Sequence, residues 1–212
     1  MPDVWRHYVK ICGVTSPEDA QMIASSGASA LGLIYATSPR RITTLQAREI
    51  VRATGDLLLR CAVFRYDDDD FILEHLDAVP VEIVQLHGAL SGGLLEALRD
   101  RPLHIVKALG IEDDEFDSFD ETSVDAVMID GAQPGSGVEH SWDRLRARTF
   151  RVPVIAAGGL TPTNVEGIVA ATGASGVDAA SGVELRPGVK DPARVAAFVE
   201  NAKIALSKVG TP

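Results

Sequence analysis

The sequence has few cysteines, few aromatic residues and a shortage of positive charge. Its 212 residues include two cysteines, and 5% are aromatic. Two cysteines without paired spacing do not form a disulfide framework, so we expect a protein of the reducing cytoplasm. The chain has 30 acidic and 20 basic residues, which gives a formal net charge of −10. Because nucleic acids and anionic membranes also carry negative charge, we expect neither as a partner.

Long apolar runs, a nucleotide-binding fingerprint and metal-ligand spacings are also missing. The longest apolar runs, such as Leu57–Leu59 and Val152–Ala157, are far too short to cross a bilayer. The first residues lack the charged-then-apolar pattern of a targeting leader. Gly13–Ser16, after the first apolar run, does not have the G-x-G-x-x-G spacing of dinucleotide-binding folds. His87 has no partner at a metal-ligand spacing. We therefore expect no cofactor and no metal.

Short apolar segments alternate with stretches of helical pattern from one end of the chain to the other. The segments that predict buried strands are His7–Val14, Ala30–Tyr35, Leu57–Phe64, Val81–Gly88, Leu103–Gly110, Asp125–Gly131, Val152–Gly159 and Gly176–Ser181. Between them, residues suited to a first helical turn predict helices that begin at Pro17, Thr44, Asp68, Gly92, Trp142, Pro162 and Asp191. A further, short helix with little apolar periodicity is expected around Glu112–Glu121.

This alternation favours an α/β fold, a closed (β/α)8 TIM barrel, because every strand is apolar enough to be buried on both faces. A chain of 212 residues suits one domain, residues 1–212, better than two small ones. An open, doubly wound sheet is the alternative, although it would usually carry the dinucleotide fingerprint. In a barrel the chemistry lies at the carboxyl ends of the strands. Residues at those ends are therefore the candidates for a site.

Cys12 closes the first predicted strand and shares a face with Lys10, since side chains alternate along a strand. Both point into the barrel if Val9 and Ile11 face the helices. Lys10 would then favour the thiolate, because a nearby cation lowers the pKa of a cysteine and makes it available as a base. The alternative is that Cys12 is simply a small buried hydrophobic residue.

Two aspartates lie at the ends of predicted strands. Asp130 ends the run Ala126–Ile129, where a buried carboxylate must be hydrogen-bonded, cap a turn or have a function. Asp178 lies inside a strand segment, which is hard to explain as a cap. It pairs with Lys10 or Lys107, or it contacts a substrate hydroxyl.

Glycine pairs follow the last two predicted strands, at the loops where barrels most often bind phosphate. Gly158 and Gly159 follow the seventh strand, and Ser181 and Gly182 follow the eighth. Glycines let backbone amides approach an anion, and a serine hydroxyl adds a donor. After the second strand, Arg40 either recognises a carboxylate through its planar fork or belongs to a solvated basic turn.

Several motifs together resemble the phosphoribosylanthranilate isomerase family of tryptophan biosynthesis, and the likeness runs along almost the whole chain. The matching segments read KICGVTSPEDA, SPR, VQLHG, the loop after Asp130, AAGGLTPTNV and GVDAASGVELRPGVKD. Their order and spacing make the resemblance specific. It implies a (β/α)8-barrel enzyme that needs no metal or organic cofactor and acts on a small phosphosugar substrate.

The resemblance also implies roles for single residues. The family's reaction is an Amadori rearrangement of N-(5-phosphoribosyl)anthranilate to 1-(2-carboxyphenylamino)-1-deoxyribulose 5-phosphate. Cys12 matches the family's general base and Asp130 its general acid. Arg40 matches the residue that binds the anthranilate carboxylate. The phosphate-binding loops match Gly158, Gly159, Ser181 and Gly182, and Asp178 matches an active-site aspartate whose role stays open.

Three segments depart from the family's usual pattern. Ala179-Ala180 precede Ser181 where the family writes V-S, which removes a hydroxyl that could donate to phosphate. The loop after the sixth strand, Gln133–Gly137, contains Pro134 and either closes over a ligand or merely connects two elements. Tyr35–Thr37 replace a more Phe-rich sequence, which alters the expected aryl pocket.

Two other functions fit parts of the pattern. A related isomerase of histidine biosynthesis acts on an aminoaldose with two phosphates, but that family typically has aspartate at the position of Cys12. Its second phosphate would meet the acidic segment Asp67–Asp70, which would mostly repel it. A non-catalytic phosphosugar-binding barrel is the other alternative, although such a protein has no use for an acid–base pair. The sequence does not predict an oligomeric state.

Overall fold

Eight parallel strands close into a barrel in their order along the chain, and β8 pairs with β1. The structure, a computed structural model, describes residues 4–65, 67–131 and 141–209. The strands are β1 (Tyr8–Cys12), β2 (Ala30–Ile34), β3 (Leu59–Arg65), β4 (Ile83–His87), β5 (His104–Gly110), β6 (Ala126–Asp130), β7 (Val154–Ala157) and β8 (Gly176–Ala179). The expected (β/α)8 barrel is confirmed, and the β1–β8 pairing excludes the open, doubly wound sheet.

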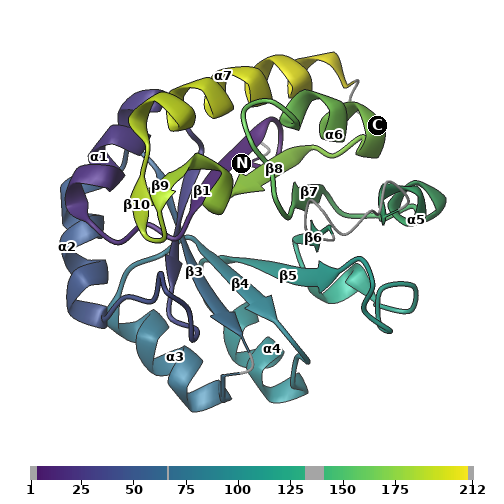
Figure 1. Ribbon diagram of the computed structural model, residues 1–212. Helices are drawn as coiled ribbons and strands as arrows, with labels where there is room; N and C mark the ends of the chain where they lie inside the picture. The colour runs from purple at the N-terminus through teal and green to yellow at the C-terminus, as the bar shows by residue number, and fades with distance from the viewer. Residues whose placement is uncertain (1–3, 66, 132–140, 210–212) are drawn as a thin grey trace.

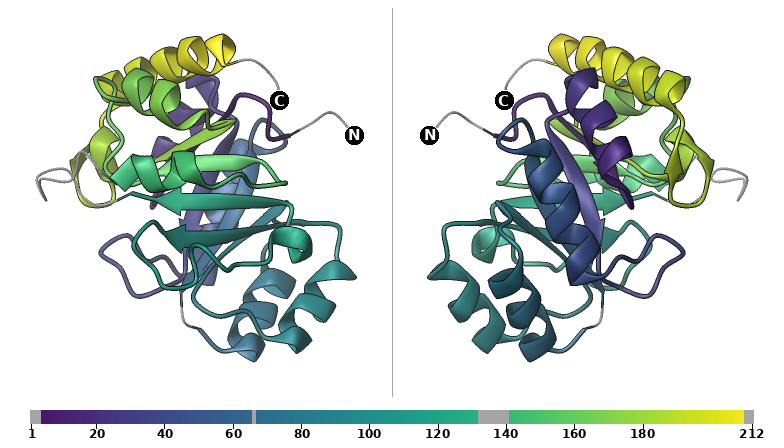
Figure 2. Two further views of the ribbon diagram at one scale, coloured as in Figure 1. Left: turned by 90° about the vertical axis from the view of Figure 1, so that its right-hand side faces the viewer. Right: turned by 90° about the vertical axis from the view of Figure 1, so that its left-hand side faces the viewer.

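Helices surround this barrel, as Figures 1 and 2 show from three directions. They are α1 (Pro17–Ser26), α2 (Thr44–Thr54), α3 (Asp69–Ala78), α4 (Gly92–Arg99), α5 (Ser141–Ala147), α6 (Val165–Thr172) and α7 (Pro192–Lys208). After β8, the short 3-10 helix η2 (Ser181–Val183) leads into a small hairpin of β9 (Glu184–Arg186) and β10 (Val189–Lys190). No helix of the described residues is both long and apolar enough to cross a membrane.

Most helices begin at or next to the expected residue, because side chains there satisfy the first free amides. The residues whose side chains accept such hydrogen bonds include Ser16, Thr43, Asp68 and Asp191. Helix α6 begins at Val165, later than the expected start at Pro162. The reason is that the Asn164 side chain accepts a hydrogen bond of 2.7 Å from the Thr161 amide and closes a turn first.

The prediction of a helix around Glu112–Glu121 is wrong. The segment forms turns, followed by the short 3-10 helix η1 (Glu121–Ser123). The Asp113 carboxylate accepts a hydrogen bond of 2.6 Å from the Gly110 amide and folds the chain back directly after β5. Phe116 is buried there and packs edge-on against Phe150, with ring centroids 6.0 Å apart. A single aromatic anchor therefore replaces the apolar face of a helix.

Alternate residues of each strand face the barrel interior or the helices. On β1, Tyr8 and Cys12 belong to the inner apolar cluster, whereas Val9 and Ile11 belong to the outer one. Trp5 closes the amino-terminal end of the barrel. Its ring lies 5.3 Å from the ring of Tyr8 and 5.5 Å from that of His104, the first residues of β1 and β5. The opposite end, where the strands finish, carries the candidate site.

Candidate active site

The first strand places Lys10 and Cys12 inside the barrel, as the two-residue alternation predicts. Both residues are buried, and Lys10 is only 1% exposed. Val9 and Ile11 pack toward the helices, which was the condition for this orientation. Cys12 is the last residue of β1. Its thiol therefore lies at the carboxyl end of the barrel, where barrel enzymes have their chemistry.

Asp178 pairs with Lys10, one of the partners expected for it. The Lys10 Nζ lies 2.9 Å from the Asp178 Oδ2, and the two residues are register partners on β1 and β8. Lys107 points out of the barrel, where it forms an ion pair with Glu115 and lies over the ring of Phe119. The Oδ1 of Asp178 is buried and has no hydrogen-bond partner among the described residues. That oxygen is free to accept a hydrogen bond from a ligand.

Lys10 favours the Cys12 thiolate, as expected, but it does not determine the net direction of the pKa shift. Burial raises the pKa of the Cys12 thiol, and this effect outweighs the attraction of Lys10. Asp178, which forms an ion pair with Lys10, also opposes ionisation of Cys12, because its negative charge repels a thiolate. The ion pair thus cancels much of the cation's influence, so the thiol stays protonated above its usual range.

Asp130 is the last residue of β6 and lies at the same end of the barrel as Cys12. The residue is exposed on one side, while the surrounding protein removes enough water from the other sides to raise the pKa of the carboxyl group. The negative charge of Asp178 raises this pKa further. No hydrogen bond from the described residues contributes to the shift. A carboxyl group with a raised pKa is suited to donate a proton.

The loops after β7 and β8 lie against each other. A Cβ atom on Gly182 would come within 1.9 Å of the Leu160 carbonyl oxygen, so only glycine permits this approach. Gly158 and Gly159 both have positive φ angles, of 92° and 64°. Their amides, like those of Ser181 and Gly182, donate no hydrogen bond to other described residues. The predicted phosphate loops therefore present free donors at one place. The Gln133–Gly137 loop lies outside the described residues.

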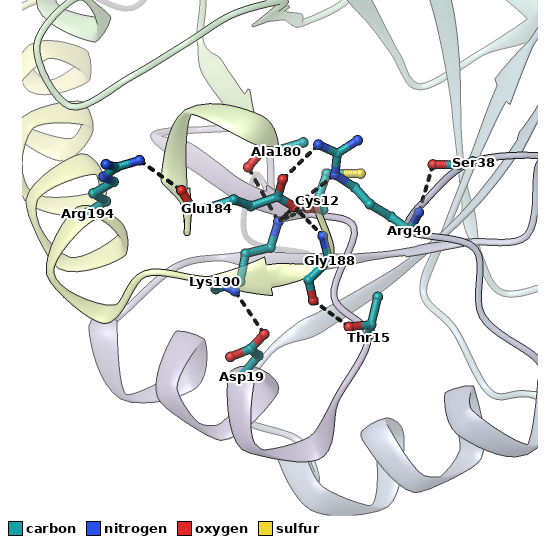
Figure 3. Close-up of polar contacts among 10 residues, drawn as sticks. All are labelled: Cys12, Thr15, Asp19, Ser38, Arg40, Ala180, Glu184, Gly188, Lys190 and Arg194. Carbon is teal, nitrogen blue, oxygen red and sulfur yellow. Dashed lines mark hydrogen bonds and ion pairs between the residues drawn. The ribbon is translucent and has the colours of Figure 1, made fainter. Parts of the chain in front are cut away.

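Arg40 lies in a turn after β2 whose other residues are exposed or partly exposed, but its own side chain is mostly withdrawn from solvent. Its side chain is 19% exposed and forms a bidentate ion pair with Glu184. The Arg40 Nε lies 2.8 Å from the Glu184 Oε1, and the Nη2 lies 2.7 Å from the Oε2. Figure 3 shows this pair next to Cys12. The Glu184 side chain also accepts a hydrogen bond of 2.8 Å from Lys190.

Sequence reasoning gave no role to Glu184, Lys190 or His87. The first two lie inside the SGVELRPGVKD segment, where the available signal was charged residues beside apolar ones. His87 ends β4 and lies 3.0 Å, between Nε2 atoms, from Gln85. Burial lowers the pKa of His87 to about 4, and the positive charges of Arg65 and Lys10 act in the same direction. It is therefore a neutral hydrogen-bonding group at the mouth.

The two candidate catalytic residues, Cys12 and Asp130, are both influenced by the charge of Asp178. Asp178 raises the pKa of both Cys12 and Asp130, which means that its carboxylate lies within electrostatic reach of both. A thiol, a desolvated carboxyl group and free amide donors thus gather at the carboxyl ends of β1, β6, β7 and β8. Together with the closed barrel, they define the class of protein: a (β/α)8-barrel enzyme.

Comparison with known proteins narrows this class to one family. The family model for N-(5'-phosphoribosyl)anthranilate isomerase matches residues 9–201. The enzyme of that name from Geotalea uraniireducens is 37% identical over 201 residues, which cover 92% of this chain and 98% of the relative. The crystal structure of phosphoribosyl anthranilate isomerase from Thermotoga maritima has a TM-score of 0.80 and 31% identity, and the match covers 92% of this chain and 98% of that one.

A second solved relative contains a ligand. It is a phosphoribosyl anthranilate isomerase in complex with reduced 1-(o-carboxyphenylamino)-1-deoxyribulose 5-phosphate, with a TM-score of 0.74, 31% identity and coverage of 92% and 98% of the two chains. The chain belongs to the N-(5'-phosphoribosyl)anthranilate isomerase family.

Proposed function

We propose that the protein catalyses the Amadori rearrangement of N-(5-phosphoribosyl)anthranilate to 1-(2-carboxyphenylamino)-1-deoxyribulose 5-phosphate, a step of tryptophan biosynthesis. The observation that carries this proposal is that Cys12 and Asp130 lie at the same end of the barrel, at the ends of β1 and β6, where the Lys10–Asp178 ion pair also lies. Family membership supports the same reaction. The relative solved with the reduced product shows that one member binds a ligand of this shape.

The first chemical step opens the sugar ring. Asp130, in its protonated form, donates a proton to the furanose ring oxygen while the bond between that oxygen and C1 breaks. The lone pair of the anthranilate nitrogen forms a C=N double bond to C1, which gives a cationic Schiff base. The raised pKa of Asp130 supports this role, because it keeps a larger fraction of the carboxyl group protonated near neutral pH than an ordinary aspartate would have.

The second step moves the double bond. The Cys12 thiolate removes the proton from C2, and the electrons of that C–H bond form a C1=C2 double bond while the nitrogen becomes neutral. The resulting enolamine then tautomerises to the aminoketose. The raised pKa of Cys12 makes the thiolate scarce but strongly basic, so proton abstraction is fast once it forms.

Two anion sites orient the substrate. The free amides of Gly158, Gly159 and Gly182, with the hydroxyl of Ser181, are suited to the phosphate. Arg40 is suited to the anthranilate carboxylate, because a guanidinium binds a carboxylate through two parallel hydrogen bonds. The Oδ1 of Asp178 is the candidate acceptor for a sugar hydroxyl.

The alternatives have less support. A histidine-pathway isomerase would need a second phosphate near the end of β3, where Asp67 and the first turn of α3 carry negative charge. A non-catalytic barrel would have no use for a desolvated acid beside a buried thiol. Two reduced cysteines, both buried, and an acidic surface support a cytoplasmic enzyme without nucleic-acid or membrane partners. We also propose that residues 1–212 form one domain.

The test is turnover of N-(5-phosphoribosyl)anthranilate, generated in solution and followed by the loss of its fluorescence. We expect rapid loss with the protein and formation of the carboxyphenylamino ketose, identified by mass and by borohydride trapping. The aminoaldose of histidine biosynthesis serves as the competing substrate. Turnover of that compound alone would replace the proposal with the histidine-pathway function, and turnover of neither would favour the binding barrel.

A further inference from the structure

A buried ionic cluster connects three segments that line the mouth of the barrel. It consists of Arg40 after β2, Glu184 at the start of β9 and Lys190 at the end of β10 (Figure 3). The Glu184 side chain is 3% exposed and the Lys190 side chain is 0% exposed. Burying charges is costly unless they are paired and hydrogen-bonded, so this cluster persists because its members satisfy one another.

Glu184 uses both carboxylate oxygens. Its Oε1 accepts hydrogen bonds from the Arg40 Nε, the Lys190 Nζ and the Gly188 amide, at 2.8, 2.8 and 3.2 Å. Its Oε2 accepts one from the Arg40 Nη2 at 2.7 Å. Burial alone would raise the pKa of Glu184, but the hydrogen bonds from Arg40 and Lys190 lower it below its usual value. The carboxylate is therefore fixed in its charged form.

Lys190 ties this carboxylate to the two neighbouring loops. Its Nζ donates to the Cys12 carbonyl oxygen at 2.6 Å and to the Ala180 carbonyl oxygen at 3.4 Å, in addition to Glu184. Three donors thus meet three acceptors, which is the full capacity of an ammonium group. The end of β1, the loop after β8 and the Arg40 pair are joined through one side chain.

One edge of the Arg40 guanidinium makes no hydrogen bond to the residues that the structure describes. A guanidinium has five N–H donors, and Glu184 takes the edge formed by Nε and Nη2. The other edge, formed by Nη1 and the second hydrogen of Nη2, has the geometry to bind a second carboxylate. The side chain also lies against the residue after Cys12, because a Cβ atom on Gly13 would come within 2.4 Å of the Arg40 Cδ. Arg40 is therefore held beside the thiol.

We infer that Glu184 is a positioning residue. It binds one edge of the Arg40 guanidinium and so orients the other edge toward the substrate carboxylate. Lys190 links this Arg40–Glu184 pair, called the clamp below, to the strand that carries Cys12. A carboxylate suits this role, because it offers two acceptor oxygens and a negative charge between the cations Arg40 and Lys190. This inference rests on the proposed function. It extends that function from Arg40, which contacts the substrate, to Glu184 and Lys190, which orient Arg40.

The test measures the binding of two ligands, reduced 1-(o-carboxyphenylamino)-1-deoxyribulose 5-phosphate and the same compound without its carboxyl group. In Glu184→Gln we expect the carboxylated ligand to bind about tenfold more weakly, as expected for the loss of a charge-assisted hydrogen bond. The ligand without a carboxyl group should bind as it does to the unmodified protein. A general loosening of the site would weaken both ligands equally, and that result would overturn the inference.

A double-mutant cycle and a matched control complete the test. In an Arg40→Ala background, Glu184→Gln should have no further effect on the carboxylated ligand, because it acts through Arg40. Glu82→Gln removes a similar arginine–glutamate pair, with Arg60, far from the site, and should leave both ligands unaffected. Additive effects of Arg40→Ala and Glu184→Gln would contradict the clamp.

A third variant covers the case in which Glu184→Gln does not fold. Arg40→Lys keeps the charge that balances Glu184 but has no fork, so it should lose the preference for the carboxylated ligand. An unchanged preference would overturn the inference. Turnover by the unmodified protein is measured in parallel: if it fails, the proposed function is wrong, whereas turnover with no effect of Glu184→Gln on carboxylate binding refutes the clamp alone.

Discussion

The two ends of the barrel use similar residues for different purposes. At the amino-terminal end, Arg60 pairs with Glu82, whose side chain is 34% exposed, and Trp5 covers the barrel interior. At the carboxyl end, Arg40 pairs with Glu184, which lies 144 residues away in the chain and is almost fully buried. The first pair joins neighbouring segments, β3 and the residue before β4. The second joins segments from the two halves of the chain, so barrel closure also assembles the site.

The two ends also differ in how many charged side chains they bury, although Arg60 is buried at the amino-terminal end as well. Buried charges at the carboxyl end are all members of pairs or clusters, such as Lys10 with Asp178 and Lys190 with Glu184. Unsatisfied atoms remain there as well, including the Asp178 Oδ1. A buried acceptor without a partner costs stability, and a ligand that donates to it recovers that cost. At the amino-terminal end, the Nε of Arg60 is also buried without a partner among the described residues, while Trp5 and Tyr8 pack against each other there.

The largest expected effect separates two aspartates at opposite ends of β6, Asp130 on the strand and Asp125 directly before it. Asp130→Asn should lower kcat by roughly 10²–10⁴, because it removes the general acid. Asp125 precedes the same strand at its other end, where its carboxylate accepts a hydrogen bond of 2.7 Å from the Ile105 amide. Asp125→Asn should affect stability slightly and kcat hardly at all. Steady-state kinetics on both variants checks this, and a large loss of kcat in Asp125→Asn would contradict the assignment of function to one end.

The next largest effect is expected from breaking the buried Lys10–Asp178 ion pair inside the barrel. Asp178→Asn should destabilise the fold by about 3–5 kcal/mol, because Lys10 is left charged and unpaired in the interior. Urea unfolding measures this change. The same variant should lower the pKa of Cys12, since Asp178 opposes thiolate formation and Lys10 favours it.

The shift in thiol pKa can be measured from the pH dependence of alkylation by iodoacetamide. A Cys61→Ala background leaves Cys12 as the one thiol in the sequence. The rate in Asp178→Asn should reach half its maximum at a lower pH than in the matched parent. An unchanged or higher midpoint would mean that the Lys10–Asp178 pair does not control the thiol.

Smaller effects should distinguish the two arginines. Arg40→Ala should raise KM by about tenfold or more and leave kcat nearly unchanged, because it removes uniform binding of a remote carboxylate. Arg60→Ala should leave KM unchanged and lower the unfolding free energy, since Arg60 is 8% exposed and its side chain joins Glu82 and the Gly55 carbonyl. If Arg40→Ala lowered kcat alone, Arg40 would act on the chemistry and not on binding.

The pH profile should show the smallest but most specific signature. The reactive form needs Asp130 protonated and Cys12 ionised, and its population is constant between the two pKa values. As the pH falls below the pKa of Asp130, the thiolate continues to decrease and kcat/KM falls. As it rises above the pKa of Cys12, the protonated acid continues to decrease and kcat/KM falls again. The acid limb should lie above 3.8 and the alkaline limb above 9.0, the ordinary values of the two groups. An alkaline limb near neutral pH would contradict the raised thiol pKa.

The sequence predicted the fold well, because barrel strands are buried on both faces and therefore consist of consecutive apolar residues. The positions of Lys10 and Cys12 followed from the same alternation. The prediction of a Glu112–Glu121 helix was wrong because turn hydrogen bonds, such as those from the Gly110 amide to the Asp113 carboxylate and from the Phe116 amide to the Asp113 carbonyl oxygen, shape that connection. The family resemblance supplied the remaining site residues, whose roles stay predictions.

Contacts between side chains that are far apart in the chain could not be predicted from the sequence. Arg40 meets Glu184, and Lys190 meets the Cys12 carbonyl, only after the barrel closes. The direction of the Cys12 pKa depended on the same kind of information. A lysine two residues away predicts a stabilised thiolate, but burial of the thiol, together with the Asp178 carboxylate on the neighbouring strand, outweighs that effect.

The most direct measurement compares the two cysteines of the barrel interior. Cys12→Ala and Cys61→Ala remove thiols of the same size from the same inner cluster, but only Cys12 is at the end of its strand. With N-(5-phosphoribosyl)anthranilate as substrate, Cys61→Ala should retain most of the activity, while Cys12→Ala should lose a factor of roughly 10²–10⁴ in kcat with an intact fold. An active Cys12→Ala enzyme would show that the base lies elsewhere and that the chemistry does not depend on this end of β1.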